Sequence, residues 1–405
     1  MSASMMAAMC GSASWRLRRT RLSSAGFKGA TAAALLFCSA GCLSTSKPDT
    51  GPSPRPQTGT PDTFAEALSA ARIETGAPGA AAAIVQDGAP IFEGASGEAA
   101  RSPSRPLRTT SLLPLVGVTH MATAVMVMRL IEEGQLSLDD PLERFVPYVP
   151  GADRITVRML LSHRSGLPDY QSQSVRFPGI YEALADPAHA WTRDEILKAI
   201  QPDDVDRAPG EYYYSNTDYV ALGAAIEQTA GMRVDAFFEQ LIAAPLGLER
   251  CLLDMDPALA PDVAQGHAWD AARREYVATF PPDGSVPTSL WGPVWTDNGI
   301  MCTAREAARF TDALFRGQLV RPETLTAMTA FNLPEGYGLG VTHNAGGDRS
   351  FIGHAGSRPG YGAAAWYDRE RRLTIVALVN ADGPSFLAGT VFQRIEQAYT
   401  RLAAP

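Results

Sequence analysis

The side chains best suited to move protons are histidines and tyrosines, among them His120 and Tyr214, each of which lies in a short segment of the chain. A histidine has a pKa near neutrality and can act as a base or an acid, and a tyrosine can take part in the same proton transfer. Covalent acyl transfer needs one more group, which is a hydroxyl or thiol activated by a neighbouring base. Whether the chain supplies that group decides which chemistry these residues can do.

A buried helix is predicted at the first of these segments, after the sequence SLLPLVGVTH that ends at His120. Residues 117–133 are apolar nearly all round as far as Arg129 and close with the sequence EEG. A helix that is apolar on every face belongs in the interior of a protein, and a glycine suits the position just after a helix. We therefore expect Gly117 and His120 to be held at the start of a buried helix.

The two ends of the chain carry the strand signals. Residues 63–75, 304–317 and 385–402 have the pattern of helices, and hairpins are predicted around Asp87-Gly88 and Arg369-Glu370, each between two apolar runs. Polar, turn-rich segments with several helices fill the middle of the chain. This order predicts an α+β fold, in which the two termini build one antiparallel sheet and the middle forms a helical insertion.

Seven segments between residues 111 and 380 occur in a recognisable order: MRLIEEGQLSLDDPLERFVP, ITVRMLLSHRSGLPDY, PGEYYYSNTDYVALGAAIEQTAG, APLGLE, DNGIMCTAREAARF, YGLG and GHAGSRPGYG. Together they resemble the serine β-lactamase and DD-peptidase (penicillin-binding) superfamily, in its class C β-lactamase-like and esterase-like branch. The resemblance implies a β-lactamase/transpeptidase-like fold, an antiparallel sheet flanked by helices plus a helical subdomain. The domain would span residues 63–402, with its sheet part at about 63–115 and 290–402 and its helical part at about 116–289.

The resemblance also implies three catalytic elements, of which two are present. Residues 214–216, Tyr-Ser-Asn, match the family's Tyr-x-Asn motif, whose Tyr helps proton transfer and whose Asn binds the substrate amide. Residues 354–356, His-Ala-Gly, match the His/Lys-x-Gly motif on the strand beside the site. An oxyanion hole would use the backbone N–H groups of Gly117 and Ser357. The candidate substrate-binding residues are Asn216, His354, Gly356, Ser357 and Arg358.

The third element, a Ser-x-x-Lys at the start of the buried helix, is missing. Aligned without a gap, the family's pattern puts Gly117 at the nucleophile position and His120 at the lysine position. The Ser-x-x-Lys at residues 44–47 precedes the globular region, whose single lysine is Lys198. Because Gly117 has no side chain, it cannot form an acyl-enzyme. The catalytic candidates that remain are Tyr214 and His120.

His120 has two interpretations. It is either a base that activates a water where the serine hydroxyl would stand, or a hydrogen-bonded histidine that fills the space of the lysine. A metal ion between His120 and His354 lacks a supporting carboxylate or cysteine, so neither a metal nor another cofactor is expected. Arg358 either holds a substrate carboxylate or is a solvated charge at the end of a strand. Thr119, the nearest hydroxyl, would point about 200° away from residue 117 on a helix.

The N-terminus has the features of an export signal. Residues 1–41 contain five basic residues and no acid, followed by the short apolar run ATAAALLFCSA and small residues before Cys42. This pattern resembles a bacterial lipoprotein signal, in which Cys42 would be lipidated; plain secretion is the alternative. Residues 42–62 are rich in Pro, Thr, Ser and Gly and are expected to form a tether. The protein is therefore expected in the cell envelope, attached to the membrane only through a lipid.

The net charge limits the classes of partner that the chain can bind, and the cysteine content limits the disulfides that it can form. Without residues 1–41 the chain has 30 Lys and Arg against 43 Asp and Glu, an acidic balance that argues against nucleic acid. Cys251 and Cys302 are too few for a disulfide framework, and the sequence leaves open whether they pair.

Three functions are compatible with these observations. The first is a catalytically inactive binding protein for a cell-wall peptide, a small acyl or ester compound, or a protein partner. The second is an ester or amide hydrolase without an acyl-enzyme, in which His120 and Tyr214 move protons around a bound water. The third is a structural envelope protein whose cleft has no ligand.

Overall fold

The computed structural model describes residues 62–171, 192–205, 207–253, 257–279, 295–331, 335–346 and 349–403. The expected signal segment, Cys42 and the tether up to residue 61 lie outside these residues. The chain from residue 61 onward forms one compact unit.

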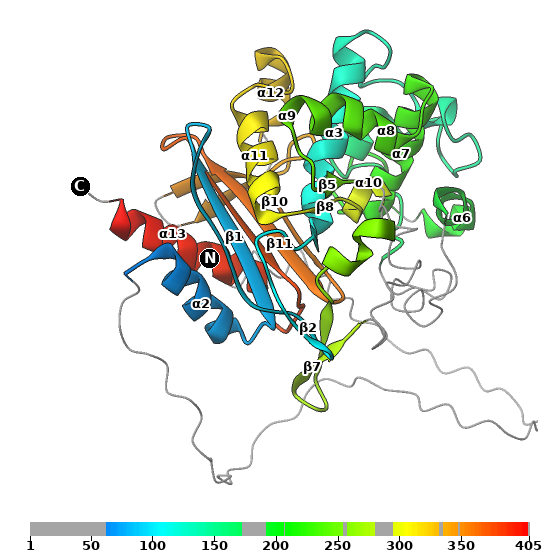
Figure 1. Cartoon of the computed structure of the whole chain (residues 1–405). Helices are drawn as coiled ribbons and strands as arrows, with labels where there is room; N and C mark the ends of the chain where they lie inside the picture. Colours follow the sequence, from blue (N-terminus) through cyan, green and yellow to red (C-terminus); the bar gives the residue numbers. More distant parts are fainter. Residues whose placement is uncertain are drawn as a thin grey trace, which may run out of the picture. The chain divides into compact units, whose positions relative to one another are not determined.

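A seven-stranded antiparallel sheet dominates this unit, with the strand order β3-β2-β1-β12-β11-β10-β9 (Figure 1). Strands from the two ends of the chain meet at its centre, where β1 pairs with β12. The strands are β1 (Gly79–Gln86), β2 (Ala89–Arg101), β3 (Ser104–Pro106), β9 (Thr342–Gly346), β10 (Arg349–Arg358), β11 (Tyr361–Asp368) and β12 (Leu373–Val379). Both predicted hairpins are confirmed, because β1 turns into β2 at Asp87-Gly88 and β11 turns into β12 around residues 369–372.

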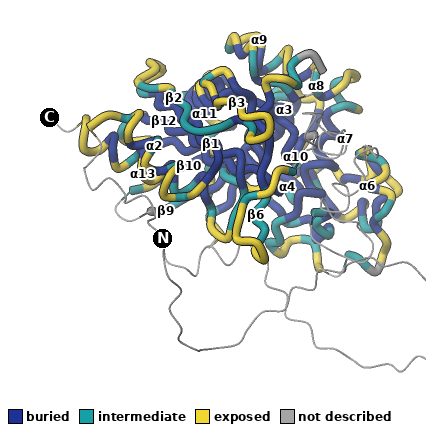
Figure 2. The backbone as a smooth tube through the Cα atoms, turned by 60° about the horizontal axis from the view of Figure 1, so that its bottom comes forward, coloured by how far each residue is buried: buried dark blue, intermediate teal, exposed yellow. Residues whose placement is uncertain are grey.

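The central strands are covered on both faces, which explains why they are apolar without alternation. In β1, Ala80, Ala82 and Ile84 belong to one core cluster, whereas Ala81 and Ala83 belong to the other. Successive strand residues point to opposite faces, so each face has its own core. Figure 2 shows these strands as a continuous buried layer inside a more exposed periphery.

Two terminal helices cover the first face of the sheet. They are α2 (Phe64–Thr75) and α13 (Leu387–Leu402), which lie side by side although they come from opposite ends of the chain (Figure 1). Thr63 and Glu66 form a capping box that fixes the start of α2. The helix α11 (Ala304–Phe315) packs on the opposite face, against β1, β11 and β12.

The helical part lies on the α11 side of the sheet and is centred on α3 and α7, which contact each other. The predicted buried helix is confirmed as α3, which a 3-10 turn precedes. The elements are η1 (Val116–Val118), α3 (Thr119–Glu132), η2 (Leu142–Arg144), α4 (Val157–Leu161), α6 (Arg193–Ala199), η3 (Pro202–Asp204), α7 (Asn216–Ala230), α8 (Val234–Phe238), η4 (Glu239–Ala243), α9 (Ala244–Leu246), η5 (Pro257–Asp262), α10 (Trp295–Asn298) and α12 (Pro322–Met328).

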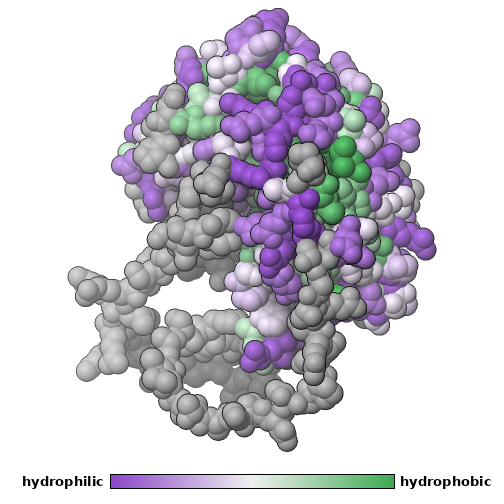
Figure 3. Space-filling view, turned by 90° about the vertical axis from the view of Figure 1, so that its left-hand side faces the viewer, coloured by the Kyte–Doolittle hydropathy of each residue, from purple (hydrophilic) through white to green (hydrophobic). Residues whose placement is uncertain are grey.

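Figure 3 shows one face, on which hydrophilic residues predominate and apolar residues form small groups. Exposed large hydrophobic side chains come from separate elements, which is ordinary for a folded domain. Among the described residues, no helix has both the length and the apolar character that crossing a bilayer requires.

Two small sheets complete the fold. One has the order β4-β8-β5, with β4 (Leu113–Pro114), β8 (Met301–Cys302) and β5 (Cys251–Leu252); the other pairs β6 (His267–Asp270) with β7 (Glu275–Ala278). Cys251 and Cys302 lie opposite each other across β5 and β8 and form a disulfide, a pairing that the sequence left open. This bond ties the helical insertion to the segment that leads back into the sheet.

The disulfide is expected to stabilise the fold. It links residues 51 positions apart, and removing a bond of this kind typically costs about 2–5 kcal/mol of unfolding free energy. The double variant Cys251→Ala/Cys302→Ala should therefore unfold at a lower urea concentration than the native protein. Reductant should lower the urea midpoint of the native protein and leave that of the double variant unchanged. A native midpoint that does not respond to reductant would contradict the pairing.

Candidate functional site

The turn that leads into α3 has a strained backbone. Val116 has a φ of 50°, a left-handed conformation that a β-branched residue rarely adopts, and it is buried. Such outliers cost free energy and cluster at functional sites. The strain lies directly before Gly117, which is the position that the sequence assigns to the nucleophile.

Gly117 lies against strand β10, which the turn η1 contacts. A Cβ atom built on Gly117 would stand 3.0 Å from the carbonyl oxygen of Ala355 and 3.2 Å from the imidazole of His354, and these two residues supply its three nearest atoms. On the other side, a Cβ on Gly356 would stand 2.6 Å from the backbone nitrogen of Gly117. Neither contact is with a hydroxyl or thiol group. The two glycines let the turn and the strand approach each other closely.

Thr119 does not substitute for the missing hydroxyl. Its side chain is buried and its Oγ accepts a hydrogen bond from the backbone N–H of Ile300, at 3.3 Å. Thr119 therefore helps to dock α3 on the segment before β8, as expected for a packing residue.

His120, one turn into the helical segment, is fully buried within a cluster of aromatic rings. It stacks on Tyr219 with a ring-centroid distance of 3.6 Å and an interplanar angle of 5°. Its ring centroid lies 4.9 Å from that of His354 and 5.7 Å from that of Tyr214. The structure thus brings together His120, Tyr214, His354 and the helix start at Asn216.

Tyr337 joins two members of this cluster. Its hydroxyl lies 2.9 Å from Nε2 of His354 and 3.3 Å from Nδ1 of His120. The sequence pointed to the segment YGLG, which begins with Tyr337, only as part of the family resemblance. It gave no sign that this hydroxyl would bridge two histidines 234 residues apart along the chain.

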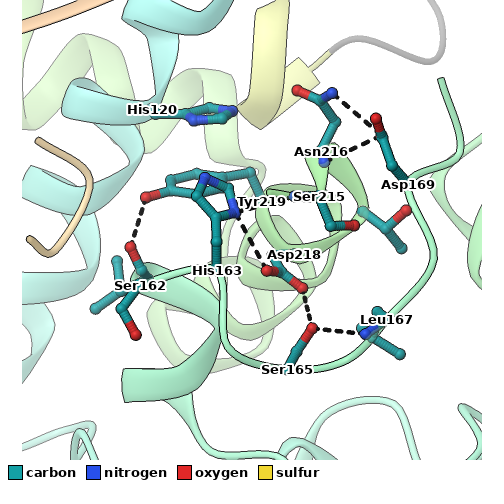
Figure 4. A network of polar contacts seen from close by, with 12 residues as sticks. His120, Ser162, His163, Ser165, Leu167, Asp169, Ser215, Asn216, Asp218 and Tyr219 are labelled. Carbon is teal, nitrogen blue, oxygen red and sulfur yellow. Dashed lines mark hydrogen bonds and ion pairs between the residues drawn. The ribbon is translucent and has the colours of Figure 1, made fainter. Parts of the chain in front are cut away.

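His163 contacts the segment that contains the Tyr-Ser-Asn motif, at Ser215 and Asp218 (Figure 4). Its Nδ1 lies 3.2 Å from a carboxyl oxygen of Asp218 and 3.3 Å from the backbone nitrogen of Ser215. Asp218 also accepts a hydrogen bond from Ser165. All four side chains are buried, so this network fixes residues 214–216 at the start of α7.

Asn216 is held by groups on two other segments. Its backbone N–H and its Nδ2 both donate to Asp169, at 3.2 and 3.1 Å, as Figure 4 shows. Its Oδ1 accepts from Nδ2 of Asn298 at 3.3 Å, and Asn298 also donates to Asp297. The amide of Asn216 therefore has a fixed orientation.

Burial disfavours the charged forms of the ionisable groups of the site. Desolvation lowers the pKa of His120 and of His163 well below its usual range, and lowers the pKa of His354 to about 4. Desolvation also raises the pKa of Tyr214 and of Asp218 well above its usual range. The position that the family resemblance gives to a lysine thus holds a neutral imidazole, and Tyr214 remains a phenol.

The strand edge beside the site extends past its neighbour. Strand β9 pairs with β10 only from Arg349 to Gly353, so residues 354–358 continue beyond that pairing. Ser357 in this stretch is exposed. Arg358 is 4% exposed and its guanidinium lies 5.4 Å from the ring centroid of Tyr361, so the interpretation of Arg358 as a solvated strand-end charge is wrong.

The described residues contain no cluster of three His, Cys, Asp or Glu side chains arranged to hold a metal ion. His120 and His354 are instead joined through a phenol.

The close approach of the turn and the strand generates a stability prediction. Gly356→Ala should cost about 1–3 kcal/mol, because its methyl group would meet the backbone nitrogen of Gly117. Gly117→Ala should cost less, since Ala355 needs to move by only a few tenths of an ångström. Ser357→Ala, on the exposed neighbour, should stay within about 0.5 kcal/mol. Urea unfolding measures all three, and equal stability of the three variants would show that the packing is loose.

Comparison with known proteins found relatives that cover most of this chain. A D-aminopeptidase of Brucella anthropi is 29% identical over 311 residues, which are 76% of this chain and 56% of that protein. Esterase EstB of Burkholderia gladioli is 26% identical over 337 residues, 75% of this chain and 86% of that protein. A penicillin-binding protein of Bacillus subtilis is 26% identical over 304 residues, 72% of this chain and 66% of that protein. The chain thus spans less than two thirds of the length of two of these relatives.

Solved structures show the same fold. The D-amino acid amidase from Ochrobactrum anthropi SV3, complexed with L-phenylalanine, superposes with a TM-score of 0.71 at 24% sequence identity, covering 84% of this chain and 99% of that one. The predicted α+β architecture is therefore confirmed. The profile of the beta-lactamase family matches residues 62–400. This chain belongs to the beta-lactamase family, the serine hydrolase family that its sequence motifs indicated.

Proposed function

We propose that this protein is a binding member of its family that forms no acyl-enzyme, and that its cleft takes a peptide-like or small acyl compound. The observation that carries the proposal is Gly117. It occupies the nucleophile position, behind a strained residue, and the atoms nearest to its Cβ position belong to a carbonyl group and an imidazole. Acyl transfer through a covalent intermediate needs a hydroxyl or thiol at that point.

The site keeps groups that can recognise an amide. The stretch of β10 beyond Gly353 can pair with an extended ligand, as sheet edges do in peptide recognition. Asn216, whose amide orientation is fixed, lies at the start of α7 and is 7% exposed. The relatives are named as a D-aminopeptidase, an esterase and a penicillin-binding protein, and these names support amide or ester compounds as the ligand class.

The proposed location is the bacterial envelope. Residues 1–41 have the order of an export signal, and Cys42 followed by the tether suits a lipid anchor. The disulfide between Cys251 and Cys302 supports an oxidising compartment outside the cytoplasm.

The alternative is a hydrolase in which His120 and Tyr214 move protons around a bound water. Their ring centroids lie 5.7 Å apart, which favours a shared role. The raised pKa of Tyr214 counts against it as a base, because burial keeps the phenol protonated. Within this alternative Tyr214 would act as a proton donor and His120 as the base.

The binding function is tested with thermal shift and calorimetry on a panel of N-acyl dipeptides, amides and esters. At least one compound should bind, and Asn216→Ala should weaken its affinity about tenfold, as loss of one or two hydrogen bonds does. Asn344→Ala, on the adjacent strand β9, is the matched control and should bind normally. If no compound on the panel binds, or if the two variants behave alike, the proposal fails.

The hydrolase alternative makes a different prediction. It requires ester or amide turnover that falls by about 10²–10⁴ in His120→Ala, the typical contribution of a general base. Our proposal expects no turnover above the background that His120→Ala shows, measured with p-nitrophenyl esters and amino-acid anilides. Turnover that disappears in both His120→Ala and Tyr214→Phe would replace the binding function with the catalytic one.

A further inference from the structure

A cavity of about 510 Å³ lies at the end of α3 that is remote from Gly117 and His120. It is lined by that end of α3, by the helical stretch from α8 through η4 to α9, and by the turn after α11. The first lining residue on α3, Arg129, stands nine positions after His120, which is about 14 Å at the rise of an α-helix. None of the lining residues belongs to the site at Gly117, so the cavity is separate from it.

One wall of the cavity has an unusual backbone. The turn η4 is a π-helix that interrupts the helical stretch between α8, which contacts α3, and α9 (Figure 1). Gln240 and Leu241 lie on this turn and line the cavity. Single π-helical turns inside helices are rare and occur frequently at functional sites. The turn therefore points to this wall independently of the cavity.

Most of the cavity lining is apolar. The apolar residues come from all three parts of the helical stretch and from the turn after α11; they are Phe237, Leu241, Pro245, Leu246 and Leu319. Phe237 and Leu319 are buried, whereas Leu241 and Leu246 are partly exposed. Pockets for small molecules typically have a volume of about 300–1,000 Å³ and an apolar lining with a few polar groups. The cavity thus has the size and the lining to hold an apolar chain.

Arg129 supplies hydrogen-bond donors at the edge of this lining. Its Nη1 donates to the carbonyl oxygen of Leu319, at 3.3 Å. Its Nε and Nη2 lie 3.5 and 3.6 Å from the carboxylates of Glu132 and Glu133, which are ion-pair distances too long for good hydrogen bonds. Within the part of the chain that the structure describes, Nη2 therefore has hydrogens left to donate.

The charges at the cavity cancel. Arg129 lies between the two carboxylates of Glu132 and Glu133, and Glu132 is also within 3.9 Å of the guanidinium of Arg321. Two positive and two negative groups leave no net charge to attract an ion. An ionic ligand would lose its hydration without gaining a free counter-charge, which is unfavourable. The remaining polar lining residues, Gln240 and Gln318, are neutral amides.

We infer that this cavity is a second binding site, for an uncharged compound that has a carbonyl group and a short alkyl chain. The chain lies against Phe237, Leu241 and Leu246, and the carbonyl oxygen accepts a hydrogen bond from Arg129. The inference does not rest on the proposed function, because the two sites share no residue.

The ligand class is tested with probes of matched chain length, measured by ligand-observed NMR titration of the whole protein. From butanamide to pentanamide to hexanamide, each added methylene should tighten binding about fourfold, as burial of a CH₂ group does. Hexanoate and hexylammonium have the same chain as hexanamide and should bind at least tenfold more weakly. Hexanoate or hexylammonium that binds as tightly as hexanamide would overturn the uncharged ligand class.

The location is tested with variants that fill the cavity. Gln240→Trp fills it from η4 and Gln318→Trp fills it from the turn after α11, and each should abolish binding of hexanamide. Both residues are exposed, so both variants should fold, which urea unfolding checks. Glu239→Trp is the matched control, because Glu239 is exposed on the same turn but does not line the cavity. This variant should bind hexanamide as the native protein does.

Hexanamide that binds both filled variants as tightly as the native protein would occupy another place, and the cavity would be refuted as its site. Native protein that binds none of the amides, or that binds all three chain lengths equally, would refute it as well. A ligand bound at Asn216 is unaffected by either tryptophan, so failure of this inference is distinguishable from failure of the proposed function.

Discussion

The contact between the turn η1 and strand β10 governs the rest of the site. Gly117 and Gly356 bring two backbones within a distance at which a methyl group on either would touch the other segment. Val116, directly before Gly117 in this turn, has a φ of 50°. Under the proposed function, this backbone arrangement persists although Gly117 offers no oxygen that could attack a substrate. The same proposal assigns the remaining polar groups to recognition, and its alternative assigns them to a chemistry without a covalent intermediate.

The same close packing buries the ionisable side chains around His120, and burial affects their protonation. A lysine at position 120 would bring a buried cation, which needs compensation from its surroundings. His120 avoids that cost by remaining neutral, stacked on Tyr219 and bonded to Tyr337. Burial likewise raises the pKa of Asp218, beside His163. The buried residues of the site thus form a hydrogen-bonded network in which burial disfavours charge.

Much of this arrangement was predictable from the sequence. Helix α3 could be predicted because its sequence is apolar on all sides. The hairpins could be predicted because turn residues separate their apolar runs. The family motifs placed residues 117, 120, 214–216 and 354–356 at one site, and the structure brings their side chains or backbones together.

Other features depend on contacts between distant segments, which periodicity does not reveal. Nothing in the segment YGLG indicates that the hydroxyl of Tyr337 bridges two histidines. The pairing of Cys251 with Cys302 depends on the register of two-residue strands. Arg358 has the sequence context of a solvated residue, yet it is buried over Tyr361. These contacts determine the chemistry of the site, so the fold was easier to predict than the function.

The most direct test of the central claim is intact-protein mass spectrometry after incubation with penicillins, active esters and fluorophosphonates, quenched within seconds. The protein should keep its mass with every reagent, because no hydroxyl or thiol stands at residue 117. The same reagents applied to Esterase EstB, a relative of the same fold family, provide the comparison. A stable mass increase located to any atom of the cleft would show that the chain has a nucleophile after all, and would contradict a binding function without an acyl-enzyme.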